Sequence, residues 1–292
     1  MTRANTITFL TNNMHQNYDG AWPYLAELAE TNAVDCLLLQ EAADPASMLS
    51  RWSAYPAPAP DGYWRIAVPD LCRGANGDVI PTRRRFGSIV VSTGQRRVDH
   101  VPAAPIHDAV ESELVTTHPG QFAIARLWLD DGTPVTVVSL YGLFERMPDG
   151  SIYSDATLHR ALSDLAPLLQ TRPTPYVLVA GDLNIWPYTG GSRFGEQSVA
   201  VFRRFADYGL EVCGPLRHAE EAPLERCPCG TPHCTHVATY HFRSNPAYRP
   251  YQNDHVLATG PFRERLLACW ADPNPEWYSH SDHRAIFTRF AA

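Results

Sequence analysis

The chain has 292 residues, of which 45% are hydrophobic and 19% charged, and its formal net charge is −7. This composition excludes a disordered or fibrous protein and allows one large α/β domain or two smaller ones. The negative net charge argues against binding nucleic acid through a uniformly basic surface, although a local basic patch remains compatible with it.

The first ten residues, MTRANTITFL, contain no long apolar segment and no small-residue cleavage site, so we expect no signal peptide. No apolar run approaches about 18 residues, which predicts that no transmembrane helix and no membrane partner are involved. The cysteine count is seven, an odd number. Free thiols in a cytoplasmic protein are therefore expected rather than a disulfide framework.

In chain order, the first half of the sequence predicts mainly strands. Thr6–Thr11 alternates in hydrophobicity, and Val34–Glu41 is a nearly continuous apolar run, typical of a strand buried on both faces. A short amphipathic helix is expected between them at Tyr24–Asn32. Further strands are predicted at Phe86–Thr93, Phe122–Leu129 and Val135–Gly142. The sequence DDGT between the last two predicts a hairpin turn.

The second half adds two helices and three strands. Leucines recur every three or four residues in Asp155–Gln170, which predicts an amphipathic helix, and Val199–Tyr208 is expected to be helical as well. The predicted strands are Tyr176–Ala180, Asp254–Thr259 and Arg284–Phe290. We expect a single domain over residues 1–292, with two packed sheets covered by helices. The pattern alone does not separate this architecture from a doubly wound fold.

Polar side chains stand where several apolar runs stop: Asn13, Glu41, Tyr141, Asp182, Asn184, Asp254, Asp282 and His283. Taken singly, most such residues are turn or cap residues. Together they offer the carboxylate and amide oxygens that Mg²⁺ selects, with a histidine and a tyrosine able to contact a phosphoryl oxygen or move a proton. Strand alternation is expected to place Asp182 and Asn184 on one face.

The segments TNNMH, LLLQE, VSLYG, AGDLN, QNDHVLAT and HSDHRAI, in this order, resemble the endonuclease/exonuclease/phosphatase superfamily, with its exonuclease III and deoxyribonuclease I-like fold. The matching blocks extend from Ile7 to Phe287, nearly the whole chain. The resemblance implies an α+β fold, a four-layer α/β/β/α sandwich of two packed mixed sheets flanked by helices. It also implies a metal-dependent hydrolase acting on phosphoester bonds.

The resemblance also implies roles for matching residues. Asn13 and Glu41 would hold Mg²⁺ or Mn²⁺, with Asp282 as a further ligand or a partner of metal-bound water. Asp182 would orient or deprotonate the attacking water, helped by the Asn184 amide. His283 would contact the scissile phosphate, steered by a hydrogen bond to Asp254. Tyr141 would support the phosphate. In-line attack on a phosphoester needs a positioned nucleophile and positive charge at the developing oxyanion.

The sequence departs from the family pattern near two of these motifs. Asn12 stands where the family often has a large apolar residue, so the metal ligand could be read as Asn12 instead of Asn13; the residues that follow favour Asn13. His15 replaces an acidic residue found in several nucleases, which leaves the number of metal ions open. Asn253 precedes Asp254 where an apolar residue is usual.

A cysteine-rich segment at about 225–238 is expected to be an insertion in this fold. It places Cys227, Cys229, Cys234 and His236 within ten positions, and thiolates with imidazole are ligands of tetrahedral Zn²⁺. His233 or His218 could replace His236, and free thiols or a redox pair are the alternatives to a structural zinc. A zinc here would brace the loop that leads to Asp254. The other cysteines are expected to be packing residues: Cys36, Cys72, Cys213 and Cys269.

The substrate is the least determined property, because this fold serves many phosphoesters. Two arginine runs could bind a phosphate backbone or form a solvated face, namely Arg83, Arg84 and Arg85, then Arg96 and Arg97. Four aromatic residues could stack on bases but more often pack in cores: Trp64, Trp186, Tyr188 and Tyr251.

The leading hypothesis is a Mg²⁺-dependent phosphodiesterase acting on nucleic acid, with DNA as first choice. The acidic charge and proline-rich loops favour an alternative, a phosphatase or phosphodiesterase for a small phosphorylated metabolite. A non-catalytic scaffold that binds a partner through the zinc loop is a minor alternative. Cleavage from ends or within strands and the oligomeric state stay open.

Overall fold

The computed structural model describes residues 5–15, 18–42, 53–56, 66–73, 79–84, 87–105, 109–111, 113–118, 120–146, 152–171, 174–187, 192–217, 227, 229–231, 234–241 and 251–292. Two six-stranded sheets form its centre. The first sheet has the order β17 (Leu266–Ala271), β18 (Ile286–Ala291), β1 (Thr6–Asn13), β2 (Cys36–Ala42), β6 (Gly87–Ser92) and β3 (Ser53–Pro56). The second has the order β15 (Leu210–Gly214), β16 (Asp254–Thr259), β14 (Tyr176–Asp182), β11 (Pro134–Leu140), β10 (Phe122–Trp128) and β7 (Val98–His100).

Both sheets are mixed, and their strand directions bring the polar ends together. β1 runs parallel to β2, with Asn13 opposite Gln40, so both strands end at the same edge of the first sheet. β11 runs parallel to β14 in the second sheet, so Tyr141 and Asp182 share an edge there. β16 runs antiparallel to β14 and places Asp254 directly opposite Asp182. The topology alone therefore collects residues that are far apart in sequence.

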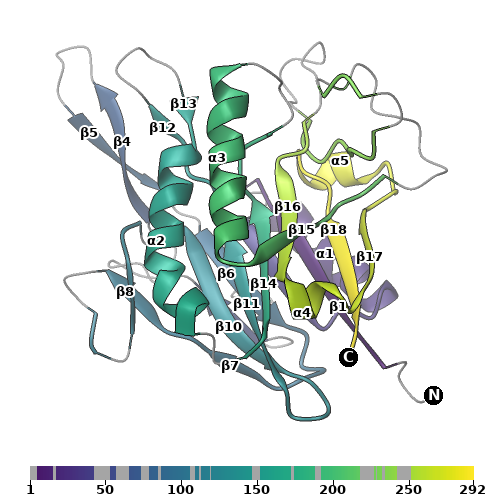
Figure 1. Cartoon of the computed structure of the whole chain (residues 1–292). Coiled ribbons are helices and arrows are strands. Elements are labelled where there is room, and N and C mark those ends of the chain that lie inside the picture. Colours follow the sequence, from purple (N-terminus) through teal and green to yellow (C-terminus); the bar gives the residue numbers. More distant parts are fainter. Residues whose placement is uncertain are drawn as a thin grey trace.

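Three apolar clusters define the four layers. The inter-sheet core contains side chains of both sheets, among them Phe9, Leu38 and Leu178. A second cluster joins the outer face of the second sheet to α2 (Asp155–Thr171) and α3 (Arg193–Asp207), and a third joins the outer face of the first sheet to α1 (Tyr18–Thr31). Figure 1 shows α2 and α3 in front of the sheets and α1 behind them. The predicted α/β/β/α sandwich is confirmed.

The minor elements are two short helices and three two-stranded sheets. The helices are α4 (Gly260–Arg263) and α5 (Trp277–His280). The small sheets pair β4 (Ile66–Arg73) with β5 (Val79–Arg84), β8 (Ala103–Pro105) with β9 (Leu114–Thr116), and β12 (Glu145–Arg146) with β13 (Ile152–Tyr153). No helix in the described part of the chain is both long and apolar enough to cross a bilayer.

The strands and helices predicted from the sequence are all present, but two helices are longer than expected. α1 and α3 each begin six residues before the predicted start. In α3 the additional turn is stabilised by Ser192, whose side chain accepts a hydrogen bond from the Gly195 backbone N–H (3.0 Å). Because this turn contains Gly195, the apolar periodicity of the sequence did not predict that it is helical. All four edge strands of the two sheets, β3, β7, β15 and β17, were also missed.

The inter-sheet core provides a test of the packing. Leu178 in β14 is fully buried between the sheets, so Leu178→Ala removes apolar contacts and leaves a cavity. We expect the free energy of unfolding to fall by about 2–5 kcal/mol in a denaturant titration. Leu267→Ala is the matched control because Leu267 is 57% exposed, and it should change stability by less than about 0.5 kcal/mol. Equal effects of the two substitutions would contradict this assignment of the core.

Candidate active site

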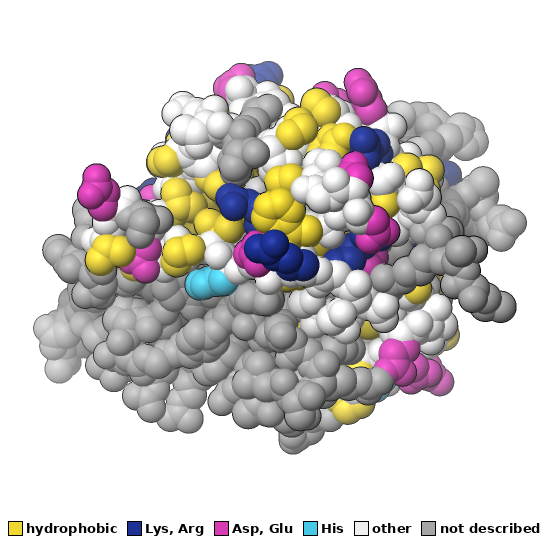
Figure 2. Space-filling view, turned by 90° about the horizontal axis from the view of Figure 1, so that it is seen from below, with side chains coloured by type: hydrophobic (Ala, Val, Ile, Leu, Met, Phe, Trp, Pro, Cys, Tyr) yellow, Lys and Arg dark blue, Asp and Glu magenta, His cyan; other side chains and the backbone are white. Residues whose placement is uncertain are grey.

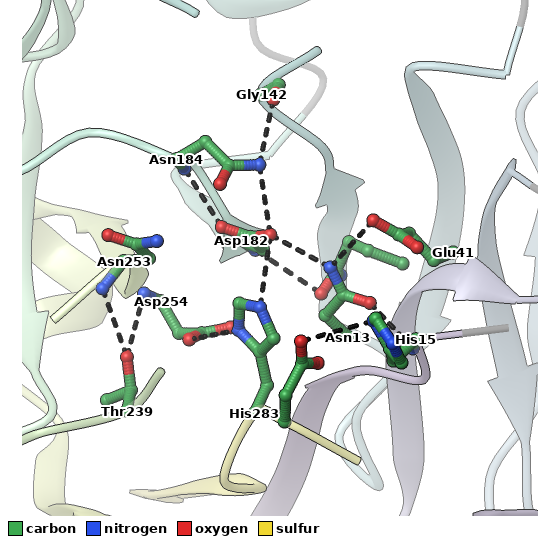
Figure 3. A network of polar contacts seen from close by, with 12 residues as sticks. Asn13, His15, Glu41, Gly142, Asp182, Asn184, Thr239, Asn253, Asp254 and His283 are labelled. Atoms are coloured by element: carbon green, nitrogen blue, oxygen red, sulfur yellow. Dashed lines mark hydrogen bonds and ion pairs between the residues drawn. The ribbon is translucent and has the colours of Figure 1, made fainter. Parts of the chain in front are cut away.

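Asp182, at the end of β14, lies at the centre of the polar network in Figure 3. Its Oδ2 atom accepts hydrogen bonds from the Nδ2 atoms of Asn13 (2.9 Å) and Asn184 (3.1 Å), and its Oδ1 atom accepts one from the Asn184 backbone N–H (2.9 Å). The backbone N–H of Asp182 donates to Oε1 of Gln40 (3.3 Å). Three of these contacts fix the carboxylate and the fourth fixes the backbone of a residue that is only 1% exposed.

Asn184 reaches Asp182 through a turn, which corrects the expectation that strand alternation puts the two on one face. β14 ends at Asp182, and Asn184 has a φ of 51°, in the left-handed region that asparagine tolerates. Its Nδ2 atom also donates to the Gly142 carbonyl (3.0 Å). A Cβ atom at Gly142 would lie 2.0 Å from the Leu183 carbonyl oxygen, so only glycine allows this approach.

His283 and Asp254 form a buried pair beside Asp182. Nδ1 of His283 lies 2.8 Å from Oδ2 of Asp254, and its Nε2 lies 3.7 Å from Oδ2 of Asp182. Burial lowers the pKa of His283, but the Asp254 and Asp182 carboxylates outweigh it and raise the pKa to about 10. The imidazole is therefore protonated at neutral pH in this arrangement. Thr239 holds the strand start, because its Oγ1 accepts the backbone N–H groups of Asn253 and Asp254 (3.1 Å each).

Glu41 points into the same site from a bulge of β2. The register with β6 shifts between Leu39 and Ala42, and Glu41 has a φ of 47°. Strained backbone of this kind is found mainly where the surrounding structure enforces a functional side-chain position. Oε1 of Glu41 accepts a hydrogen bond from the Tyr141 hydroxyl (2.6 Å) and a longer one from Asn13 Nδ2 (3.4 Å). Tyr141 thus contacts the expected metal ligand directly.

Asp282 borders the site from the segment before β18. Its Oδ2 atom lies 3.2 Å from Nδ1 of His15, which is 50% exposed. Ser281, the preceding residue, accepts the His283 backbone N–H (3.0 Å) and donates to the Asn13 carbonyl (2.6 Å). Asn12 donates to the His283 carbonyl (3.1 Å), whereas Asn13 donates to the Asp182 carboxylate, so Asn13 stays the predicted metal ligand.

The donor set fits a hard divalent cation. Four carboxylates belong to this network. Asp182 and Asp254 lie beside the buried His283, whereas Glu41 contacts Asn13 and Asp282 contacts His15. The Oδ1 atoms of Asp254 and Asp282 are buried and have no hydrogen-bond partner among the described residues. Burial and, less strongly, Asp254 raise the pKa of Asp182 to about 7 against the opposing effect of His283. This uncompensated negative charge is what a bound Mg²⁺ or Mn²⁺ would balance.

The Cys/His cluster, formed by Cys227, Cys229, Cys234 and His236, is a second convergence of ligand atoms. Its three sulfurs and one ring nitrogen all lie within 4.8 Å of one another. Sγ of Cys227 is 3.3 Å from Sγ of Cys229 and 3.3 Å from Nδ1 of His236. None of these three cysteines forms a disulfide. The buried Cys36, Cys213 and Cys269 belong to the inter-sheet core, which confirms their expected packing role.

Several further candidates from the sequence are not placed at the site. Arg96 is 7% exposed and pairs with Asp35 (3.2 Å) and Asp130 (2.6 Å), so it is a structural residue. Trp186 is fully buried and cannot stack on a base. Arg83 and Arg84 lie in β5 without described side chains. Tyr251 packs edge-on against Trp186, with ring centroids 5.1 Å apart. The other candidates lie outside the described residues: Arg85, Trp64, Tyr188, His218 and His233. The Cys72 side chain is likewise not described.

Arg97 lies on the opposite side of the molecule, near β7, and pairs with Asp99 (2.8 Å). Figure 2 shows this lower face, where Arg side chains lie beside Asp and Glu and among hydrophobic groups. Such mixed charge gives no continuous basic surface in the described part of this face. It therefore does not resemble a surface that binds a phosphate backbone.

Gln40 is a site residue that sequence reasoning did not single out. It is fully buried and its Nε2 donates to Oγ of Ser139 (2.9 Å) in the other sheet. Its Oε1 meanwhile receives the Asp182 backbone N–H. Gln40 thereby connects the two sheets beneath the site. The signal was available, since an uncharged polar residue inside the apolar run LLLQE needs an internal partner.

Comparisons with known proteins support the fold. No family model matches the chain, and no curated protein matches it. Among solved structures, the AP endonuclease LMAP from Leishmania major has a TM-score of 0.62 at 15% identity, with 98% of this chain and 88% of that one covered. An AP endonuclease from Archaeoglobus fulgidus has a TM-score of 0.59 at 14% identity, with coverages of 98% and 100%. The 3′-5′ exonuclease NExo from Neisseria meningitidis has a TM-score of 0.58 at 14% identity, with the same coverages.

Proposed function

We propose that this chain, which has the fold of the endonuclease/exonuclease/phosphatase superfamily, is a divalent-cation-dependent phosphodiesterase that hydrolyses nucleic acid, with DNA as its first substrate. The observation that carries the proposal is the fixed, buried Asp182 with a protonated histidine on one side and an unbalanced group of carboxylates around it. This arrangement offers a base and positive charge to the same reacting centre.

Asp182 is the residue that we assign to the attacking water. Three donated hydrogen bonds hold its carboxylate in one orientation. Its pKa, raised to about 7 chiefly by burial, is suited to accepting a proton near neutral pH. We assign the Asn184 amide to the same water or to a phosphate oxygen, which it can reach once substrate displaces one of its present contacts.

The cation would be held by Glu41 and Asp282, with the Asn13 amide oxygen as a third donor. When bound, it supplies Lewis-acid stabilisation of charge on the phosphoryl oxygens. Tyr141 donates to Glu41 and so fixes the orientation of that ligand. We therefore assign Tyr141 a positioning role through Glu41, in addition to the phosphate contact that the resemblance implies.

His283 is assigned to a phosphate oxygen. As an imidazolium it donates from Nδ1 to Asp254 (2.8 Å), while Nε2 lies 3.7 Å from Oδ2 of Asp182, beyond hydrogen-bond distance. The longer second contact is the one that a phosphate oxygen can replace. Asp254 keeps the ring oriented and favours its charged form.

The choice of DNA rests on the neighbours' own activities. The similar structures are AP endonucleases and a 3′-5′ exonuclease, and another NExo structure is of a 3′ phosphatase bound to a product DNA hairpin. The second candidate, a hydrolase for a small phosphorylated metabolite, is favoured by the net charge of −7 and by the structural pairing of Arg96. A structural Zn²⁺ at the Cys/His cluster completes the cofactors that we propose.

The test is a hydrolysis assay on end-labelled single- and double-stranded DNA, with free phosphate measured in parallel. We expect shortened strands with Mg²⁺ or Mn²⁺ and none with a chelator present. Replacement of Arg83–Arg85 by alanine should lower DNA affinity and weaken its salt dependence if these residues bind the backbone. Intact DNA together with hydrolysis of small phosphoesters would favour the metabolite enzyme. Absence of hydrolysis of either class would favour a non-catalytic scaffold.

A further inference from the structure

We propose that the Cys/His cluster is a tetrahedral Zn²⁺ site, and that this ion positions the segment which holds the His283–Asp254 pair and the Asn184 turn. The zinc site itself is independent of the proposed phosphodiesterase function. Only the effect of this positioning on catalysis rests on the proposed function.

The ligand geometry matches zinc. Bond lengths of about 2.3 Å to sulfur and about 2.05 Å to nitrogen place the ligands of a tetrahedral Zn²⁺ about 3.6–3.8 Å apart. The cluster has its ligand atoms within 4.8 Å of one another, with the two shortest separations at 3.3 Å. A Cys227–Cys229 separation of 3.3 Å is too long for a disulfide, whose sulfurs are about 2.05 Å apart.

The ligand types also favour zinc over the cation of the active site. Thiolates and imidazole suit Zn²⁺, whereas Mg²⁺ and Mn²⁺ prefer oxygen donors. Four protein ligands fill a tetrahedron and leave no open position for water, which is typical of structural sites. The backbone N–H of Thr231 points at Sγ of Cys229 (3.4 Å), and Gly230 has a φ of 65°. This turn gives the sulfur the N–H donor that stabilises a thiolate.

The segment around the cluster has little regular structure of its own to hold it. No helix or strand is present within the described residues 227–239. Arg217 donates two hydrogen bonds to the middle of this segment. Its backbone N–H donates to the Thr235 carbonyl (2.8 Å), and its Nε donates to the Cys234 carbonyl (3.2 Å). A metal with four ligands would supply cross-links that such a short irregular segment cannot obtain from apolar burial.

Three contacts lead from the cluster to the catalytic residues. The His236 ring packs edge-on against the buried Trp186 ring, with centroids 6.4 Å apart, and Trp186 is two residues from Asn184. Val237 donates its backbone N–H to Oε1 of Gln252 (3.0 Å). Thr239 then accepts the backbone N–H of Asp254 (3.1 Å).

The same segment also contacts His283. Tyr240 forms an isolated β-bridge with His283, and their rings have centroids 4.7 Å apart. The next residue, His241, donates its backbone N–H to the Asp282 carbonyl (2.9 Å). Loss of the ion would therefore release contacts to Asn184, Asp254 and His283 together, although no cluster residue touches the reaction centre.

The primary test measures zinc in the full chain, purified without chelators, by mass spectrometry of the elements. We expect about one zinc per chain, as one four-ligand site requires. Cys227→Ala and Cys229→Ala should lower that value by at least about tenfold. Cys213→Ala is the matched control, since it also removes one thiol but lies outside the cluster, and it should retain the zinc.

The positioning role needs a readout other than activity. Hydrogen exchange of the backbone over residues 251–259 reports on the bonds from Asn253 and Asp254 to Thr239. We expect exchange there to accelerate in Cys227→Ala and in the wild-type chain stripped by a chelator, and to slow again when Zn²⁺ is restored. The reversal on restoring Zn²⁺ distinguishes this result from simple misfolding of a variant.

A chain that binds no zinc and titrates with free thiols at all three positions would overturn the site. Oxidation of Cys227 and Cys229 to a disulfide in the native chain would overturn it in favour of a redox pair. Zinc binding with unchanged exchange over residues 251–259 would overturn the positioning role. These measurements need no substrate, so failure of the phosphodiesterase assay leaves them interpretable.

Discussion

Asp182→Asn is expected to lower kcat/KM for DNA cleavage by about 10²–10⁴-fold, because it removes the group that we assign to the attacking water. The amide cannot accept a proton from water at neutral pH. It still occupies the same space between Asn13 and Asn184. The measurement is the initial rate of cleavage of end-labelled DNA at fixed Mg²⁺, across a range of substrate concentrations.

The fold of this variant should persist. An asparagine turns its NH₂ group toward one of the present donors, which costs about 1 kcal/mol, while the cost of burying a charge is removed. We therefore expect a change in the free energy of unfolding of no more than about 1–2 kcal/mol.

Asp207→Asn is the matched control for charge, because Asp207 is exposed at the end of α3, and it should cleave DNA at the wild-type rate. Near-normal cleavage by a folded Asp182→Asn variant would contradict the assignment of the base.

The sequence allowed the polar strand ends to be identified because short motifs keep their local geometry. The strands that carry Asn13, Glu41, Asp182 and Asp254 were all predicted, and the register of β14 with β16 places two of these residues face to face. Which atoms touch depends on features that a pattern does not encode. Asn184 approaches Asp182 through a left-handed turn and not by strand alternation.

Long-range contacts were the part that the sequence could not supply. Arg96 stands in a short basic run of the kind that is usually solvated. Its side chain is nevertheless buried and pairs with Asp35, which is 61 positions away. Tyr141 was placed near the phosphate by resemblance, but its hydroxyl contacts Glu41 across 100 positions. The spacing of the Cys/His cluster indicated ligands, whereas the packing of His236 on Trp186 depends on how two distant loops meet.

The His283–Asp254 pair is expected to act as one unit, which a double-mutant cycle can measure. Asp254→Asn and His283→Gln should each lower kcat/KM by about 10²–10³-fold. The kcat/KM of the double variant should lie no more than about tenfold below that of the less active single variant, because the effects of residues that share one role are strongly non-additive. The measurement is the same cleavage assay on all four proteins.

The physical reason is the charge of the imidazole. The Asp254 and Asp182 carboxylates raise the pKa of His283 against the effect of burial, so removing the Asp254 charge favours the neutral ring. A neutral ring is a weaker donor to phosphate, and without the 2.8 Å contact at Nδ1 it is also free to turn. Either change removes most of what His283 contributes, so removing the ring as well costs little more.

Asn253→Ala is the control for this cycle, because it alters the neighbouring side chain but keeps the backbone N–H that donates to Thr239. It should retain wild-type activity and exchange over residues 251–259. Strictly additive losses in the double variant would mean that Asp254 and His283 act independently. In that case the Asp254 carboxylate would have a role other than orienting the histidine, because Asp254→Asn keeps the backbone contact with Thr239.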